Sequence, residues 1–433
     1  MKRIVSLLLC VILAVTLCAC GGNKTPGKAA EKAEIKPQAP ELNADDIKTI
    51  SSNVVANGFD EAFISYIAGN KSGNFMVSPV SFRYALGLLL AGAEGDTKEE
   101  LLKALGVADV EEWTAYCTKF NGFVKSFYGQ LDSEIEQHNE YVKKGYVDKN
   151  SPAPARALKV ANSVWKRENI EKDFSEEYKK YIAANYGAEY FGFTEDNAVQ
   201  KINGWVNEKT EKLIPRLLPD GYDTQGLAVV LMNALYFKDN WETAFYESAT
   251  IRDDFHTEGG ETVKKDFMRQ TENYAYYEDG KTQAVILPMS GGINMAFVLG
   301  DESGLSEKLS KAAGRQVSVK IPKMDIETSL DRKELMNFLA ENGVKSAFNR
   351  ETADFSKMID HKIWVDDIIQ KTRIKTDEEG VEAAAVTAIM VNDTAMPAPV
   401  EPVEFVADRP FSFYIYATYD DVTAILFAGK MVQ

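Results

Sequence analysis

The sequence predicts an α+β fold in which a helical N-terminal part precedes large mixed or antiparallel β-sheets. The chain has 433 residues, of which 45% are hydrophobic, so it can bury a large core. Apolar residues recur at helical spacing between residues 59 and 128, whereas alternating or continuous apolar runs dominate from residue 227 onward. Strands and helices do not alternate regularly, which favours antiparallel over parallel sheets.

The helical part is expected to contain helices at residues 59–67, 80–91, 98–105 and 111–128, with a short strand at 74–78 before Pro79. Residues 132–154 are polar and rich in turn formers, so we expect a surface excursion there. The later strands are expected at residues 227–237, 283–287, 294–299, 316–322, 371–376, 411–418 and 423–430.

The first twenty residues resemble a bacterial lipoprotein leader. Lys2 and Arg3 precede an apolar run that is shorter than the roughly 20 residues of a membrane-spanning helix. The run closes with Leu17-Cys18-Ala19-Cys20, which resembles the lipobox, although Cys18 stands where Ala or Ser is more usual. We therefore expect residues 1–19 to be a signal peptide and Cys20 to be lipidated, so that the protein is exported and anchored to the bacterial membrane at the cell surface. Plain secretion and a retained anchor helix are the alternatives.

Residues 20–43 are rich in Gly, Pro, Ala, Lys and Glu, and we expect them to form a flexible tether. The folded body is expected to be a single domain over residues 44–433. Of the four cysteines, only Cys117 lies in this body, so we expect no disulfide and a small buried thiol.

Composition and motifs disfavour several functional classes. The net charge of -16 argues against nucleic-acid binding through a basic surface. The three histidines lie outside an HExxH motif, no GxSxG elbow occurs, and the body has too few cysteines for structural zinc. We therefore expect no enzymatic activity and no metal ion or organic cofactor.

One long connection near the C-terminus, at residues 378–403, joins two expected strands. Such long loops are usually functional or disordered. Residues 381–396 contain no Pro or Gly, whereas Pro397, Pro399 and Pro402 follow, so only the first half could join a sheet as an interior strand. Gly380 could supply the backbone freedom of a hinge. An Ala-rich surface loop without such a role is the alternative.

Six segments of the body, in family order, resemble motifs of the serpin family, and the resemblance extends over nearly the whole of residues 44–433. They are Asn74–Ser81 (NxxxSPxS), residues 92–97, Ala161–Trp165 (ANSVW), residues 202–214, Asn233–Phe245 (NALYFKDNWETAF against NAxYFKGxWxxxF), and the C-terminal strands at 405–411 and 425–430.

The resemblance implies an irreversible suicide-substrate inhibitor of serine proteases. A protease attacks the exposed loop, forms a covalent acyl complex, and is carried along as the loop inserts into the main sheet as an extra strand. The partners would be the target protease and, through Cys20, the lipid membrane, with no nucleic acid, and the inhibitor would be a monomer. A serpin-fold binding protein whose loop is merely a protease substrate is the alternative.

The resemblance also implies roles for individual residues. The loop hinge would comprise Glu378, Glu379, Gly380, Val381, Glu382, Ala383, Ala384 and Ala385, and the shutter and breach regions would contain Ser78, Ser81, Asn203, Trp241 and Gln370. Two positions depart from the family. Val381 stands where inhibitors usually have Thr or Ser, but it is β-branched and uncharged, so insertion should survive. Gln370 stands where His is common, and it too can donate and accept hydrogen bonds.

Counting the family's usual loop length from Glu378 gives Thr394–Ala395 as the reactive bond, within a window from Val391 to Met396. Residues 381–400 contain no Lys or Arg, which disfavours trypsin-like targets. The small side chains in the window favour an elastase-like or subtilisin-like target, and its methionine leaves a chymotrypsin-like one possible. The acidic body would attract a cationic protease at low salt.

Overall fold

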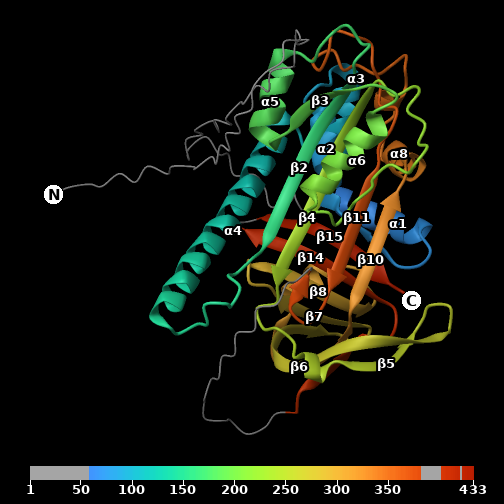
Figure 1. Cartoon of the computed structure of the whole chain (residues 1–433). Helices are drawn as coiled ribbons and strands as arrows, with labels where there is room; N and C mark the ends of the chain where they lie inside the picture. The colour runs from blue at the N-terminus through green and yellow to red at the C-terminus, as the bar shows by residue number, and fades with distance from the viewer. Residues whose placement is uncertain (1–57, 382–400, 420–421) are drawn as a thin grey trace. The chain divides into compact units, whose positions relative to one another are not determined.

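The structure is a computed structural model that describes residues 58–381, 401–419 and 422–433 (Figure 1). All of these residues belong to one compact unit. The expected signal peptide, Cys20 and the tether lie outside the described residues, as do residues 44–57 of the expected body.

The helices of the first half begin and end at recognisable caps. Ser78 caps α2, since its side chain accepts a hydrogen bond from the Ser81 amide and Pro79 occupies the first turn. Asp109 caps α4 in the same way, and Gly145 ends it in the left-handed conformation at φ 74°. The helices are α1 (Gly58–Asn70), α2 (Pro79–Leu90), α3 (Gly95–Leu105), α4 (Val110–Lys144), α5 (Glu176–Tyr186), α6 (Ala198–Lys209), α7 (Leu305–Ser310) and α8 (Arg332–Glu341).

A nine-stranded sheet contains most of the C-terminal half. Its order is β1-β15-β14-β8-β7-β6-β9-β13, with β5 paired to β6, and every pair is antiparallel except β13 with β9. The strands are β1 (Phe75–Val77), β5 (Ile251–His256), β6 (Thr262–Glu278), β7 (Thr282–Pro288), β8 (Ile293–Gly300), β9 (Ala313–Pro322), β13 (Val403–Val406), β14 (Phe411–Tyr419) and β15 (Val422–Met431).

A six-stranded sheet has the order β10-β11-β12-β4-β2-β3 and is antiparallel except for β2 with β3. Its strands are β2 (Ala157–Arg167), β3 (Glu189–Phe193), β4 (Val229–Asn240), β10 (Met324–Leu330), β11 (Gln370–Thr376) and β12 (Gly380–Val381). These two mixed sheets and the leading helices confirm the α+β prediction.

The main hydrophobic core contains residues of both sheets and of α2, in which every residue except Ala85 is buried. A second cluster lies between the six-stranded sheet and α6, where Trp205 and Ile202 meet Trp165 and Met232. Figure 1 shows α6 lying across β2 and β4. The core therefore holds the six-stranded sheet from both faces.

The expected surface excursion at residues 132–154 is largely wrong. Helix α4 continues to Lys144, and only the following residues form turns and irregular chain. The stretch 132–144 is polar but contains no Gly or Pro, so nothing ends the helix before Gly145. None of the helices in the described ranges is long and apolar enough to span a bilayer.

Candidate functional site

The described part of the expected hinge, residues 378–381, leads into a slot between two strands of the six-stranded sheet. After β11 the chain turns at Asp377, whose amide donates to the Gly380 carbonyl over 3.0 Å and whose side chain accepts from the Glu379 amide over 2.9 Å. The strand β12 then lies between β11 and β4, with Val381 opposite Thr376 and Asp239. The first loop residues thus already hold a strand position, and Val381 is only 3% exposed.

Gly380 is required here by close approach rather than by an unusual backbone conformation. A Cβ atom at this position would overlap the carbonyl oxygen of Asp239 in β4. Any side chain would therefore push β12 away from its neighbour. From the sequence, Gly380 is interpreted as a source of backbone freedom, and the structure adds this steric reason for a glycine.

The hinge carboxylate Glu378 is buried and held from two sides. Its side chain pairs with Lys323 at 2.6 Å and accepts a hydrogen bond from the Thr250 hydroxyl at 2.6 Å. Burial alone would raise the pKa of Glu378, but the contacts with Lys323 and Thr250 hold it below its ordinary value. The Phe245 amide also donates to the Glu378 carbonyl over 2.7 Å.

Trp241 closes the same end of the slot. Its indole N–H donates to the Asp377 carbonyl over 2.9 Å, and its backbone amide donates to the Glu379 carbonyl over 2.8 Å. The residues that follow β4 thus donate hydrogen bonds to three successive carbonyls of the hinge turn, those of Asp377, Glu378 and Glu379. The serpin resemblance assigns Trp241 to the shutter and breach regions, and the structure places it against the hinge turn.

Beyond the hinge, the seam between β4 and β11 lacks a strand ladder. Within the part of the chain that the structure describes, β4 pairs with β2 on one side and with β12 on the other, and β11 pairs with β10 and β12. Residues 363–370 face the beginning of β4 across cavities of at most about 20 Å³. Side chains such as Leu231 and Ile369 fill this seam, but no direct ladder joins the two strands.

A hydrogen-bonded cluster ties the middle of the seam to the start of α2. Gln370 binds both backbone groups of Ser78, accepting from its amide over 3.0 Å and donating to its carbonyl over 2.9 Å. The Ser78 hydroxyl donates to the Leu426 carbonyl over 2.7 Å. The Ser81 hydroxyl contacts the Asn233 side chain, which donates over 2.6 Å to Asn162. The structure therefore brings Ser78, Ser81 and Gln370 together.

Asn203 is not part of this cluster, and its expected place there needs correction. It lies on α6, where its side chain accepts from the amides of Leu217 and Leu218 and donates to the Leu218 carbonyl. It therefore shapes the turn after α6. Asn233 and Asn162 take the place in the cluster, and both lie in motifs quoted above, although sequence spacing alone could not show which asparagine faces the seam.

Asp239, opposite Val381, was missed. It stands where the family motif NAxYFKGxW has Gly, which was the one available signal. The side chain is fully buried and accepts hydrogen bonds from the amides of Gly291 and Asn240, each over 2.9 Å. Burial raises the pKa of Asp239 to about 6, against the opposing effects of these amides and of Arg156.

The remaining expected site residues lie outside the described residues. These are Glu382, Ala383, Ala384 and Ala385 of the hinge and the bond Thr394–Ala395. In the described ranges no group of three or more His, Cys, Asp or Glu side chains is arranged to hold a metal ion. Cys117 is buried, and burial raises the pKa of its thiol.

Comparison with known proteins identifies the family. The family model described as "Serpin (serine protease inhibitor)" matches residues 61–433. The chain belongs to the serpin family. The leukocyte elastase inhibitor of Equus caballus is 32% identical over 385 residues, covering 83% of this chain and 93% of that protein.

Solved serpin structures agree with this assignment. Serpin48, described as a highly specific serpin of the insect Tenebrio molitor, matches with a TM-score of 0.66 and 29% identity, covering 87% of this chain and 96% of that one. A complex of thyroxine-binding globulin with thyroxine shares the fold, with a TM-score of 0.68 and 22% identity, covering 88% and 98% of the two chains. The proteins similar to this chain thus include an elastase inhibitor and, at the level of the fold, a thyroxine-binding globulin.

The Glu378–Lys323 pair should stabilise the protein in a pH-dependent manner. Replacing Lys323 with Met leaves a buried carboxylate without its cation, and we expect a loss of about 2 kcal/mol at pH 7. Because the folded pKa of Glu378 lies below its ordinary value, this stabilisation is present above that value and is lost as the pH falls through the folded pKa. Urea unfolding at several pH values measures this loss of stability.

The control variant Lys311→Met breaks an exposed pair with Glu307 and should change stability by less than about 0.5 kcal/mol. Equal losses in both variants would contradict the expectation.

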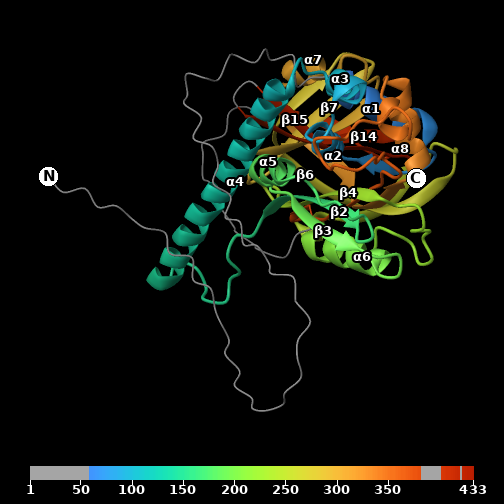
Figure 2. The same cartoon turned by 90° about the horizontal axis from the view of Figure 1, so that it is seen from above.

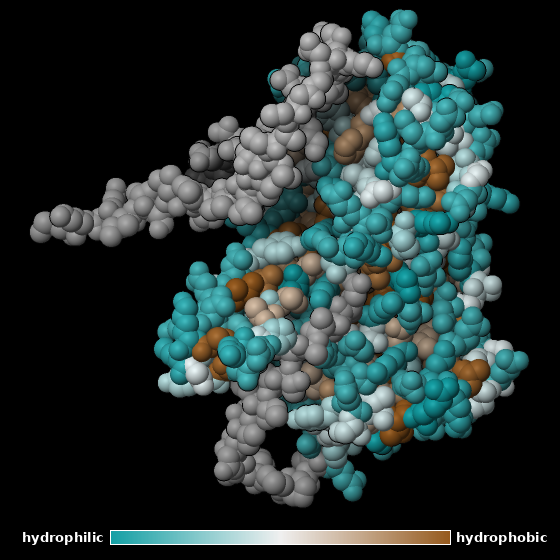
Figure 3. Space-filling model, in the orientation of Figure 1, coloured by the Kyte–Doolittle hydropathy of each residue, from teal (hydrophilic) through white to brown (hydrophobic). Residues whose placement is uncertain are grey.

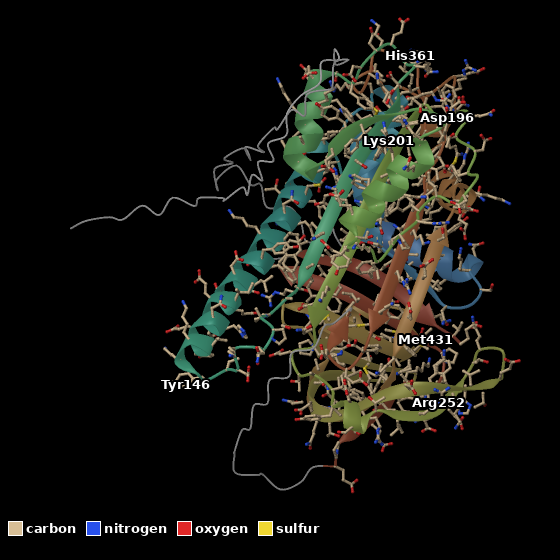
Figure 4. All side chains as sticks on the ribbon, in the orientation of Figure 1. Tyr146, Asp196, Lys201, Arg252, His361 and Met431 are labelled. Carbon is tan, nitrogen blue, oxygen red and sulfur yellow. The ribbon has the colours of Figure 1, made fainter. Side chains whose placement is uncertain are left out.

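Asp239 should make the protein less stable as the pH rises through about 6. Its folded pKa of about 6 exceeds the ordinary 3.8, so the folded carboxyl keeps a proton that the unfolded chain releases. Relative to wild type, Asp239→Asn should gain up to about 3 kcal/mol between pH 4 and pH 8, at about 1.4 kcal/mol per pKa unit. The measured quantity is the change of this difference with pH, since the amide also alters hydrogen bonding at every pH. The exposed control Asp196→Asn (Figure 4) should show no such trend.

Proposed function

We propose that this serpin is an irreversible suicide-substrate inhibitor of serine proteases, with an elastase-like or subtilisin-like enzyme as its target. The observation that carries the proposal is Val381, buried between β4 and β11 at the head of a seam without a ladder. A strand begun there can continue along both edges once the loop is cut. Each added residue would gain ladder hydrogen bonds that the uncut protein lacks.

The register of β12 predicts which residues would lie opposite one another after insertion. Continuing the pairs Val381–Asp239 and Val381–Thr376 places Glu382 between Lys238 and Lys375. It places Thr387 between Asn233 and Gln370, the polar cluster at the middle of the seam. Both placements are chemically favourable. The carboxylate would lie between two cations, and the hydroxyl would lie among amides with which it can form hydrogen bonds.

The same register fixes the two faces of the inserted strand. Ala383 and Ala385 would lie opposite Phe237 and Leu235, which belong to the main core. Ala384 would lie opposite Tyr236 and Arg373 on the other face. Small side chains on the core face would enter the seam without overpacking.

The register also supports the position of the reactive bond. Pairing continued to the first residue of β4, Val229, ends at Val391. Thr394–Ala395 then lies just past the end of the available strand. The cut would thus occur where insertion has used the full length of β4.

Inhibition should leave a covalent protease complex. The full chain is mixed with an elastase, a subtilisin, a chymotrypsin and a trypsin, and denaturing gels and peptide masses are recorded. We expect a complex that survives boiling, formed with the elastase or the subtilisin, and a released peptide that begins at Ala395. No complex with trypsin is expected, because the window holds no Lys or Arg. Cleavage without any complex would instead support a binding protein whose loop is only a substrate.

That second candidate is favoured by one observation. A groove of about 870 Å³ lies between α1, α7, β14 and β15, with Ile64, Leu305 and Ile425 among its lining residues. Its volume suits a small organic ligand. Binding without inhibition would appear in the protease experiment as cleavage alone.

A matched pair of loop variants tests insertion itself. Ala385→Glu would place a carboxylate in the main core, whereas Ala384→Glu would place it on the face that carries Arg373. Burying an unpaired charge costs several kcal/mol, so Ala385→Glu should slow insertion, and most molecules should be cleaved as substrate. The number of inhibitor molecules consumed per trapped protease should rise severalfold for Ala385→Glu and stay near the wild-type value for Ala384→Glu. The reverse order would refute the register.

Export and lipid anchorage at Cys20 complete the proposal. They are supported by the sequence of residues 1–20, with secretion as the alternative. A tethered inhibitor would act on proteases that reach the cell surface. The tether of residues 20–43 would hold the folded body within reach of them.

A further inference from the structure

A helical arm begins beside the hinge end of the six-stranded sheet. The buried residues of α4 end with Leu131, but the helix continues to Lys144 and a turn follows to Tyr146. We call residues 132–146 the α4 arm. In Figures 1 and 2 it stands clear of the rest of the body, and Figure 4 shows Tyr146 at its tip.

Contacts along α4 fix the level at which the arm leaves the body. Phe127 packs against Gly291, whose amide binds the Asp239 side chain opposite Val381. Two turns later, Glu134 pairs with Arg156, just before β2 begins. From Phe127 to Lys144 the helix extends about 25 Å at 1.5 Å per residue. The arm therefore projects past the level at which the reactive loop leaves the sheet.

The arm is anchored rather than loosely attached. Arg156 donates to both carboxylate oxygens of Glu134, each over 3.1 Å, and its guanidinium lies 5.1 Å from the centre of the Phe127 ring. Near the tip, Lys144 pairs with Glu140, and the Tyr146 amide donates to the Tyr141 carbonyl over 2.9 Å. A partner that docks here would lose little conformational entropy in the arm.

The tip carries exposed aromatic side chains. Tyr146 is 75% exposed and Tyr141 38%, with their rings 6.1 Å apart. In the described ranges, the third exposed large hydrophobic side chain is Tyr246, at 66%. Tyr246 follows Phe245, whose amide binds the Glu378 carbonyl. Tyr246 therefore lies next to the hinge, at the end of the sheet toward which the arm projects.

Hydrophobic residues are also visible on the arm, at the lower left of Figure 3. Exposed tyrosines supply large contact area at low entropic cost and are enriched at protein interfaces. A serine protease of about 220 residues is roughly 40 Å across, so one engaged on the loop would extend over its surroundings. Its edge would reach both Tyr246 and the arm.

We propose that the α4 arm, through Tyr141 and Tyr146, together with Tyr246, forms a second docking surface for the protease engaged on the reactive loop. This inference rests on the proposed inhibitory function. The surface strengthens the encounter before the loop is cut. It takes no part in strand insertion, because none of its residues borders the seam.

The test uses the full chain with Tyr141→Ala and Tyr146→Ala combined, and with Tyr146→Ala alone, which leaves the helix untouched. Two measurements are made with elastase and with subtilisin. The first is the rate of covalent complex formation by active protease. The second is the equilibrium affinity for the same protease with its catalytic serine replaced by alanine. For at least one of the proteases we expect the double variant to lose about tenfold in both, with an unchanged number of inhibitors consumed per protease.

Two controls separate docking from folding. Tyr141→Phe combined with Tyr146→Phe keeps both rings and should retain most of the affinity. Glu177→Ala alters an exposed position on α5 and should behave as wild type. Unfolding midpoints should agree among all variants.

The outcomes distinguish the two proposals. Unchanged affinity and rate in the alanine variants, while wild type traps protease, would overturn the docking surface alone. If the wild-type protein trapped neither protease, the inhibitory function would be overturned. The affinity of the variants for the inactive protease would still test the arm. A change in the self-association of the chain, with protease affinity unchanged, would mean that the arm binds a second copy and would also overturn the proposal.

Discussion

The structure depends on one tight contact, between Gly380 and the Asp239 carbonyl of β4. It lets two loop residues enter the sheet while the rest of the seam has no ladder. Glu378, Lys323 and Trp241 hold the turn around this contact, so the entering strand has one register. A slip by one residue would exchange the two faces of every following residue and place Glu382 toward the core.

The seam is held closed by side chains and by Gln370, and its backbone groups are not used in pairing across it. In the proposed mechanism, a further strand inserted there would form hydrogen bonds that the uncut protein lacks. The hinge supplies the start and the register, and the Ala-rich sequence supplies side chains that fit. In the mechanism that we propose, these three features would let an α+β body act through a change of its own sheet.

Much of the site could be predicted from sequence, because family motifs place residues in known strands. Ser78, Ser81 and Gln370 meet as expected, and Trp241 lies at the hinge. Asn203 does not join them, since a motif gives a helix but not the direction in which one side chain points. Asp239 was missed because its neighbours across the slot come from distant segments. The length of α4 was not predicted, because residues 132–144 are as polar as a turn region. Polarity does not end a helix, and α4 ends only where Gly145 adopts the left-handed conformation.

The presence of Gln370 at the middle of the seam has a consequence for acid conditions. A glutamine side chain exchanges no proton over the physiological range, so the bond between the middle of the seam and α2 keeps its strength in acid and base alike. Two buried carboxyls do respond to acid, Asp239 at the entrance of the slot and Asp367 beside Ile369 in the seam, because burial raises the pKa of each to about 6. Mild acidification would therefore neutralise a carboxyl at the entrance and another beside the seam, while the hydrogen bonds of Gln370 to Ser78 would stay unchanged.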